Sequence, residues 1–289
     1  MEYYVKPNGE KHRISTIDDF EYGHVYLFFR IELIKKLLDA GLPISWISHD
    51  VFKVSSPNGG TVLCGISKKD NIFVISADIA RQDSWLQLLF HSENIHPEEC
   101  NDYAGCELVQ NQMMCEFLST EAPEEKFKCL VKELDEAFKK RTNVRLFKHI
   151  DHSDKIMASV SRFLSINDEG YVYLAKILTK AIIERIDEKE LIKFINDRVK
   201  TEGLRGISLL GICVNLLNPI IDGKESVKFL RDINTIRQVD AHFMSSDQAE
   251  KKKSVIEGPL GLSFVAKGAY LIDCTNKGIE NLISIFKGE

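Results

Sequence analysis

The sequence predicts an α+β fold in which a small mixed α/β domain, residues 1–150, is followed by an all-α helical bundle, residues 151–289. Short β-branched and aromatic runs separated by turn signals occur in the first half of the chain. The second half shows apolar residues at intervals of three and four, which is typical of amphipathic helices. A polar segment at residues 148–156 separates the two patterns and is the expected domain boundary.

The composition is that of an ordinary soluble globular protein. The chain has 289 residues, of which 44% are hydrophobic and 28% are charged, so it can build two domain cores. No apolar run approaches the roughly 20 residues that span a bilayer, and the N-terminus lacks the pattern of a secretion signal. The seven cysteines are odd in number, and several have apolar neighbours, which favours reduced thiols and a cytoplasmic location.

The charge distribution argues against a protein that coats nucleic acid. The formal net charge is -5, and residues 151–289 carry 20 of the 38 Lys and Arg residues and 20 of the 43 Asp and Glu residues. Because neither half is basic, we expect any contact with RNA to be local.

The first domain is predicted to contain an antiparallel meander, because turn signals at residues 56–60 and 67–70 join three apolar runs. The aromatic segment at residues 24–30 is either a further strand or the beginning of the next helix. The predicted strands are residues 46–55, 61–66 and 71–76, and the predicted helices are residues 31–40, 79–91 and 106–140, with an interruption near Pro123.

The second domain is predicted to contain four to six helices. The last of them includes Gly268 and Gly278, each of which costs about 1 kcal/mol relative to Ala and so indicates close packing or a bend. The predicted helices are residues 171–186, 191–195, 206–217, 224–241 and 262–286, and the lysine run at residues 251–253 is expected in a loop.

The helix predicted at residues 224–241 ends in an Arg-x4-His pair, Arg237 and His242. Arg237 follows Ile233 by four residues, so it lies at the edge of the apolar stripe, next to a loop. A guanidinium binds phosphate oxygens, and an imidazole titrates near neutral pH and can transfer a proton. Together they can cleave RNA without a metal: a base frees the ribose 2′-OH, the Arg stabilises the phosphorane, and an acid protonates the leaving oxygen.

The stretch Ile-Arg-Gln-Val-Asp-Ala-His-Phe that begins at Ile236, inside an all-α region, resembles the HEPN superfamily, whose hallmark is Arg-x4-6-His at such a position. The resemblance covers about residues 155–289. It implies a helical bundle that forms a homodimer, with the Arg and His of both copies in one cleft. Many members are metal-independent endoribonucleases of toxin–antitoxin, abortive-infection and other anti-phage systems. By this resemblance Arg237 would bind and polarise phosphate, and His242 would transfer the proton.

The resemblance also defines the supporting residues and the partners. The position after the Arg is usually a small polar residue in this family and is Gln238 here. The lysine run can add positive potential beside the site. The expected partners are RNA, a second copy of the chain and an ATPase, helicase or antitoxin, with no membrane, metal or cofactor. The supporting residues are Gln238, Asp240, Lys251, Lys252 and Lys253.

Two alternatives to catalysis stay open. Arg237 can form an ordinary surface ion pair with Asp240 or with acids near Glu225, while His242 only terminates a helix. The domain can also be a non-catalytic HEPN-like scaffold that dimerises or docks in a larger defence or nucleic-acid-processing complex. If the second domain is the enzyme, the first domain would sense a trigger, bind a partner or restrain the second domain.

Other parts of the chain contain residue types that bind metals. The His and Cys spacing matches no compact zinc module, and the Glu-x-Lys patterns fall in helical or loop segments instead of strands. No metal site is therefore expected. The weighed residues are His91, His96, Cys100 and Cys106 for zinc, and Asp50, Asp78, Glu124 with Lys126, and Glu250 with Lys252 for a divalent cation.

Overall fold

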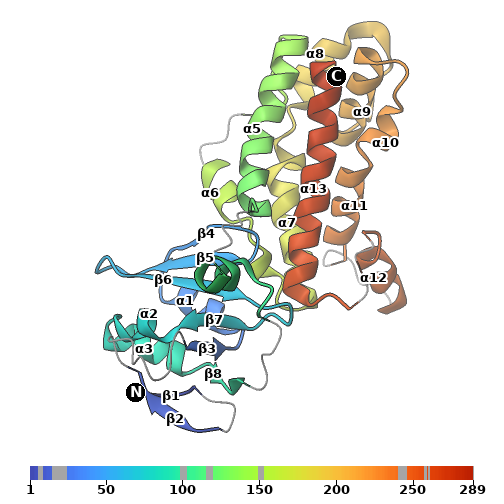
Figure 1. The fold of residues 1–289 in the computed structure, drawn as a ribbon. Helices are drawn as coiled ribbons and strands as arrows, with labels where there is room; N and C mark the ends of the chain where they lie inside the picture. Colours follow the sequence, from blue (N-terminus) through green and yellow to red (C-terminus); the bar gives the residue numbers. More distant parts are fainter. Residues whose placement is uncertain are drawn as a thin grey trace. The chain divides into compact units, whose positions relative to one another are not determined.

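A computed structural model of the chain shows two compact units, Met1–Ala122 and Pro123–Glu289 (Figure 1). The first is a mixed sheet-and-helix unit and the second is helical, which confirms the predicted fold class. The structure describes residues 1–5, 9–14, 25–97, 103–114, 120–148, 153–239, 246–256, 259 and 261–288.

A six-stranded antiparallel sheet forms the first unit, in the order β4-β5-β6-β7-β3-β8 over the described residues. Its middle strands confirm the predicted meander, and the aromatic segment at residues 24–30 contributes β3, a strand whose residues are all buried. The strands are β3 (Tyr26–Phe29), β4 (Ile44–Trp46), β5 (Val51–Ser55), β6 (Thr61–Ile66), β7 (Ile72–Ile75) and β8 (Asn94–Ile95).

The prediction of a single strand at residues 46–55 is wrong, because the chain reverses direction within this range and forms two strands, β4 and β5. Trp46 pairs with Phe52 across antiparallel β4 and β5. The backbone N–H groups of Ile47 and Ser48 both donate to the carbonyl oxygen of Val51, at 2.9 and 3.1 Å, and close the turn. The sequence of this turn contains no glycine or proline, so the apolar run hides the reversal.

Short helices and a two-stranded ribbon complete the first unit. Its core is aromatic, with Phe29, Phe52, Phe73 and Phe90 fully buried. The Tyr3 hydroxyl donates to the Gln87 backbone oxygen at 2.8 Å and attaches the ribbon to the unit. The remaining elements are β1 (Glu2–Tyr4), β2 (Lys11–Arg13), α1 (Leu33–Asp39), α2 (Ser76–Ala80), α3 (Ser84–His91), α4 (Glu107–Val109) and the π-helix η2 (Gln110–Met114).

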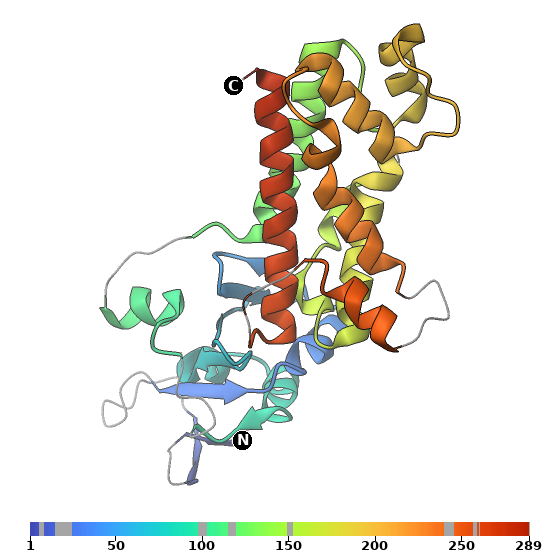
Figure 2. The same cartoon turned by 90° about the vertical axis from the view of Figure 1, so that its right-hand side faces the viewer.

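The second unit is a helical bundle, with the isolated bridge Phe147↔Ile186 as the one β-type pairing among its described residues. The long helices α5 and α13 run side by side (Figures 1 and 2). No helix in the described part of the chain is long and apolar enough to cross a bilayer. The elements are α5 (Pro123–Thr142), α6 (Ser153–Ala158), η3 (Arg162–Leu164), α7 (Asp168–Ala181), η4 (Ile183–Arg185), α8 (Glu188–Ile195), η5 (Asn196–Arg198), α9 (Gly206–Leu217), α10 (Gly223–Ser226), α11 (Lys228–Arg237), α12 (Ser246–Lys253) and α13 (Phe264–Lys287).

The boundary between the compact units lies after Ala122, whereas the polar segment at residues 148–156 predicted it about 30 residues later. Helix α5 belongs to the helical unit because its apolar face packs on α13. The rings of Phe138 and Phe286 have centroids 5.0 Å apart, and the Asn276 side chain donates to the Pro123 backbone oxygen at 2.9 Å. The polar segment therefore falls inside the second compact unit and does not mark its beginning.

The two glycines inside α13 provide close packing, as predicted. A Cβ atom on Gly278 would lie 2.4 Å from the Phe229 ring of α11, and one on Gly268 would lie 2.7 Å from the Ser165 Cβ. Both distances are too short for carbon atoms, so neither position has room for a larger side chain. These glycines let α13 approach α11 and the segment before α7.

A buried ion pair joins the beginning of α5 to η3. The Arg162 side chain donates to both carboxylate oxygens of Glu124, at 2.9 and 2.8 Å, and its backbone N–H donates to the same carboxylate at 3.0 Å. The two side chains are 4% and 1% exposed. Glu124, the acid of one Glu-x-Lys pattern, is therefore committed to this pair.

Candidate functional site

Helix α11 carries the candidate arginine at its last residue. The helix predicted at residues 224–241 is two helices, because Val227 leaves the helical conformation between α10 and α11. Leu230, Ile233 and Ile236 form the buried face of α11, and the helix packs on α7. The sequence predicted a stripe of Phe229, Ile233 and Ile236; the last two are buried as predicted, whereas Phe229 is only partly buried and Leu230 takes its place.

Arg237 forms an ion pair with Glu184 of η4, with 3.1 Å between Nη1 and Oε1. The two side chains are 37% and 45% exposed, so solvent screens the pair and its contribution to stability is below about 1 kcal/mol. A guanidinium has several N–H donors, and one acceptor leaves others available for a phosphate. The partner of Arg237 among the described residues is thus an acid of another element, and Asp240, one of the acids expected for this pair, lies outside the described residues.

His242 and Asp240 lie outside the described residues. The described part of the site ends at Val239, just after Gln238 caps α11. The side-chain oxygen of Gln238 accepts a hydrogen bond from the Lys252 Nζ at 3.3 Å. Gln238 therefore holds Lys252 beside the end of α11.

The lysine run lies on helix α12, and the prediction of a loop is wrong. Four residues with good helix propensity, Ala-Glu-Lys-Lys, begin at Ala249 and support the helix. The three lysines have different surroundings. Lys252 reaches Gln238, whereas Lys253 pairs with Glu250 and, at 3.1 Å, with Asp168 of α7. Burial lowers the pKa of Lys253, but its two carboxylate partners outweigh this effect and raise the pKa overall.

Lys251 has an exposed side chain and no ion-pair partner among the described residues. Of the three lysines, it is therefore the one whose charge is neither paired nor held by a side-chain hydrogen bond in the described part of the unit. Lys253 instead attaches α12 to the beginning of α7. The positive potential expected from the run thus comes mainly from Lys251 and Lys252.

A hollow of about 380 Å³ adjoins the Arg237–Glu184 pair, because Glu184 also lines it. Arg231 donates from Nη1 to the Lys224 backbone oxygen at 3.0 Å and keeps its other donors. Glu188 is occupied by the Gly206 backbone N–H at 2.9 Å. The charged and amide residues that line this hollow are Lys148, Glu184, Glu188, Arg205, Arg231 and Asn234.

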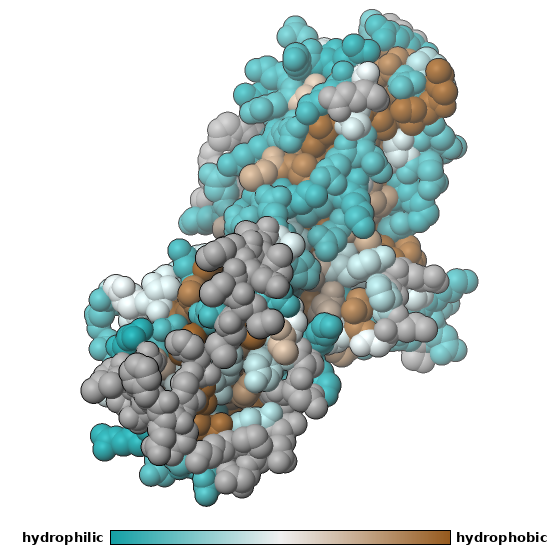
Figure 3. Space-filling model, in the orientation of Figure 1, coloured by the Kyte–Doolittle hydropathy of each residue, from teal (hydrophilic) through white to brown (hydrophobic). Residues whose placement is uncertain are grey.

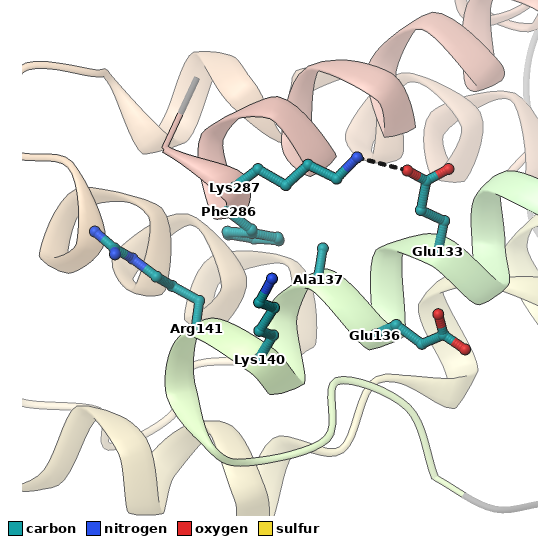
Figure 4. A pocket seen from close by; sticks show the side chains of 7 residues that line it. All are labelled: Glu133, Glu136, Ala137, Lys140, Arg141, Phe286 and Lys287. Carbon is teal, nitrogen blue, oxygen red and sulfur yellow. Dashed lines mark hydrogen bonds and ion pairs between the residues drawn. The ribbon is translucent and has the colours of Figure 1, made fainter.

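A larger hollow of about 570 Å³ lies between α5 and α13 (Figure 4). The Lys287 Nζ and the Glu133 Oε1 are 2.8 Å apart across it, and the Glu136 carboxylate points away from Phe286. Five of its seven lining residues are charged, and it contains no histidine or cysteine that could transfer a proton near neutral pH. We therefore do not assign the active site to it.

The residues weighed as metal ligands have other roles. Among the described residues, no group of three or more His, Cys, Asp or Glu side chains could hold a metal ion. The His91 Nε2 lies 3.0 Å from the Glu2 backbone oxygen, and the Cys106 thiol donates to the Ile66 backbone oxygen at 3.1 Å. The Asp50 carboxylate accepts the Glu107 backbone N–H at the beginning of α4.

His96, Asp78 and Glu250 also contact neighbouring side chains. The His96 ring packs on the Tyr4 ring, with centroids 5.7 Å apart, and Cys100 lies outside the described residues. Asp78 pairs with Arg81 at 3.4 Å. Glu250, the acid of the second Glu-x-Lys pattern, pairs with a lysine on its own helix. Structural contacts thus account for the described side chains of both metal hypotheses.

Comparisons with protein-family models, with curated proteins and with solved structures give no match to this chain. The functional argument therefore uses the residues around α11 and their contacts.

Proposed function

We propose that the helical unit is a HEPN-type, metal-independent endoribonuclease that acts in bacterial anti-phage defence or as a toxin. The observation that carries this proposal is the position of Arg237, whose partly exposed guanidinium stands at the end of a firmly packed helix. The segment that follows brings His242 within five residues of it in the sequence. In this proposal Arg237 binds the scissile phosphate and His242 transfers a proton.

The reaction follows from these two side chains. A base takes the proton of the ribose 2′-OH, and the oxygen attacks the adjacent phosphorus. Arg237 stabilises the charge that develops on the phosphorane oxygens, and a protonated imidazole donates its proton to the leaving 5′ oxygen. The products are a 2′,3′-cyclic phosphate and a free 5′-hydroxyl. In this proposal the phosphate of the RNA competes with the Glu184 carboxylate for the guanidinium.

The second candidate function is a non-catalytic scaffold. The Arg237–Glu184 pair and the equal numbers of acids and bases in residues 151–289 favour it, because both reduce attraction for RNA. Hydrophobic surface of the helical unit gathers near α9 and α10, where Ile220 is 96% exposed (Figure 3). An exposed apolar surface of this kind can take part in a protein interface, including the homodimer that either function expects.

The deciding experiment incubates the full chain with total RNA in EDTA. We expect cleavage by the wild type, with loss of at least about 100-fold in Arg237→Ala and in His242→Ala, the range found when a charge-stabilising or proton-transfer group is removed. Arg141→Ala, which removes an exposed arginine of α5, is the matched control and should cleave normally. The cleaved ends should carry a cyclic phosphate and a 5′-hydroxyl.

Two outcomes reject the enzyme. One is cleavage that persists in His242→Ala, which would point to a contaminating nuclease. The other is the absence of cleavage by a chain that light scattering shows to be dimeric. This result, obtained with and without the proteins encoded by neighbouring genes, would support the scaffold.

A further inference from the structure

A second hollow of about 570 Å³ lies in the helical unit, between the first turns of α7 and α13 and the end of α12; we call it the α7–α13 hollow. Asp168 and Tyr171 line it from α7, Phe264 and Lys267 from α13, and Lys253 from α12. Its volume lies within the range of about 300–1,000 Å³ that is usual for small-molecule sites.

One wall of the α7–α13 hollow is aromatic and apolar. The rings of Tyr171, Phe264 and Tyr270 and the side chain of Ile256 line it. Tyr171 is the most buried of these residues, with 7% of its surface exposed. Aromatic side chains offer a planar ligand large contact areas in offset or edge-on ring contacts. The wall therefore suits a ligand with a planar ring.

Tyr171 also brings an unsatisfied polar group to the hollow. Its hydroxyl has no hydrogen-bond partner among the described residues, whereas the hydroxyl of Tyr270 is hydrogen-bonded to Cys274. Burial raises the pKa of Tyr171 to about 12, with a smaller contribution from Cys274, so the hydroxyl stays protonated and can donate. A buried donor without an acceptor is unfavourable, and a ligand oxygen that accepts from it removes this cost.

Two lysines line the hollow, and only Lys253 has ion-pair partners among the described residues. It pairs with Asp168 at 3.1 Å and with Glu250. Lys267 has an exposed side chain whose Nζ lies 4.9 Å from the centre of the Phe264 ring, and no described carboxylate pairs with it. Because α7 and α13 both begin at the hollow, their helix dipoles add positive potential. An anionic group is therefore favoured beside Lys267.

The charges around the hollow match a ligand with a single negative charge. Lys253 is outnumbered by its two acids, Asp168 and Glu250, whose side chains are 62% and 70% exposed. A phosphate monoester carries nearly two negative charges near neutral pH, so these acids repel it more strongly than they repel a carboxylate. A carboxylate has two oxygens, which is enough to accept from both Lys267 and the Tyr171 hydroxyl.

We propose that the α7–α13 hollow binds a small aromatic carboxylate, whose carboxylate accepts from Lys267 and the Tyr171 hydroxyl and whose ring lies against Phe264 and Tyr270. The ligand would also contact α12, the helix whose Lys252 donates to Gln238 just after the end of α11. The site goes beyond the proposed ribonuclease function and does not rest on it, because binding is measured without RNA.

The test titrates four ligands into the full chain by calorimetry. They are 3-phenylpropionate, its neutral amide 3-phenylpropanamide, propionate, which lacks the ring, and phenyl phosphate, which carries the larger negative charge. We expect 3-phenylpropionate to bind most tightly and each of the others to bind at least about tenfold more weakly, because each lacks the ring or the single charge that the hollow recognises.

Matched tyrosine variants report on the hydroxyl. Tyr171→Phe keeps the ring, removes only the hydroxyl and should weaken the binding of 3-phenylpropionate about tenfold, the effect of losing a hydrogen bond to a charged group. Tyr173→Phe, which removes the hydroxyl of a tyrosine that is 49% exposed on the same helix, should leave the affinity unchanged. Lys267→Gln should weaken binding about two- to fivefold, because its charge is exposed to solvent.

Circular dichroism confirms that each variant is folded, and Lys267→Gln keeps the test decisive if Tyr171→Phe does not fold. Equal affinity of the wild type and of either folded variant, Tyr171→Phe or Lys267→Gln, for 3-phenylpropionate overturns the proposal. So does the absence of binding of 3-phenylpropionate at millimolar concentration. Binding of the amide or of phenyl phosphate as tight as that of 3-phenylpropionate would also overturn it, because the hollow would then not select a single negative charge.

Discussion

Removal of the buried Arg162 side chain should destabilise the helical unit more than most single substitutions. In Arg162→Met the carboxylate of Glu124 stays buried at 1% exposure and loses two side-chain hydrogen bonds. Breaking a buried pair from one side costs about 3–5 kcal/mol, because the remaining charge is uncompensated. For a unit of this size each kcal/mol lowers Tm by about 2–4 °C, so we expect a decrease of about 6–20 °C.

Thermal unfolding of the full chain, followed by circular dichroism at 222 nm, measures this effect. Lys128→Met is the matched control, because it breaks a solvent-exposed ion pair with Glu125 on the same helix and should cost less than about 1 kcal/mol. The double variant Arg162→Met/Glu124→Leu should recover part of the lost stability, since it leaves no unpaired charge and only the backbone N–H of residue 162 loses its acceptor. A Tm of Arg162→Met equal to that of the control, or a double variant as unstable as the single one, would refute the reasoning.

Three further predictions concern the same unit. Gly278→Ala should lower the free energy of unfolding by about 1–3 kcal/mol in urea, because the new Cβ meets the Phe229 ring at 2.4 Å. Asp135→Ala should lower it by about 1–3 kcal/mol, because two buried backbone N–H groups lose their acceptor. Iodoacetamide at pH 8 should modify the exposed Cys129 quickly and Cys213 only after unfolding, since burial raises the pKa of Cys213 to about 12.

Each of these has a control within the chain. Gly105→Ala should cost far less than the α13 substitution, because nothing lies within 4 Å of the added Cβ. Asp135→Asn keeps an acceptor oxygen and should be milder than Asp135→Ala. Peptide mapping by mass spectrometry reports the thiol rates. Equal alkylation of both cysteines in the native protein would contradict the assigned burial.

The helical half of the fold was predictable because its signal is local. The apolar residues of α7, α9, α11 and α13 recur at intervals of three and four, so the sequence alone predicts these helices. The break at Val227 was missed because Val227 and its neighbours continue the apolar spacing, and the Asp222 cap that begins α10 acts on one short turn. The boundary near Pro123 was missed because it depends on which unit covers α5, and the α5–α13 contact joins residues such as Pro123 and Asn276, which are 153 positions apart.

Of the Arg237–Glu184 pair in the candidate site, the sequence could predict the arginine and could not predict the glutamate. The stripe of α11 located Arg237, since helical spacing alone determines where that residue leaves the helix. Its partner Glu184 gave no signal, because the two residues meet through the packing of α7 against α11. The same limit applies to Tyr171, whose place in the α7–α13 hollow depends on the approach of α12 and α13 to α7.

The two arginine–glutamate pairs of the helical unit have the same chemistry, and only burial separates their roles. Arg162 and Glu124 are sealed from water, so no phosphate can reach the guanidinium without unfolding the segment around η3. Arg237 and Glu184 are each more than a third exposed, and their ion pair stabilises the folded unit by less than about 1 kcal/mol. A phosphodiester that offers two oxygens to the guanidinium can compete with one exposed carboxylate. Glu184→Gln should therefore tighten RNA binding and leave the stability of the unit almost unchanged. A loss of RNA binding in that variant would show that the carboxylate positions Arg237 instead of competing for it.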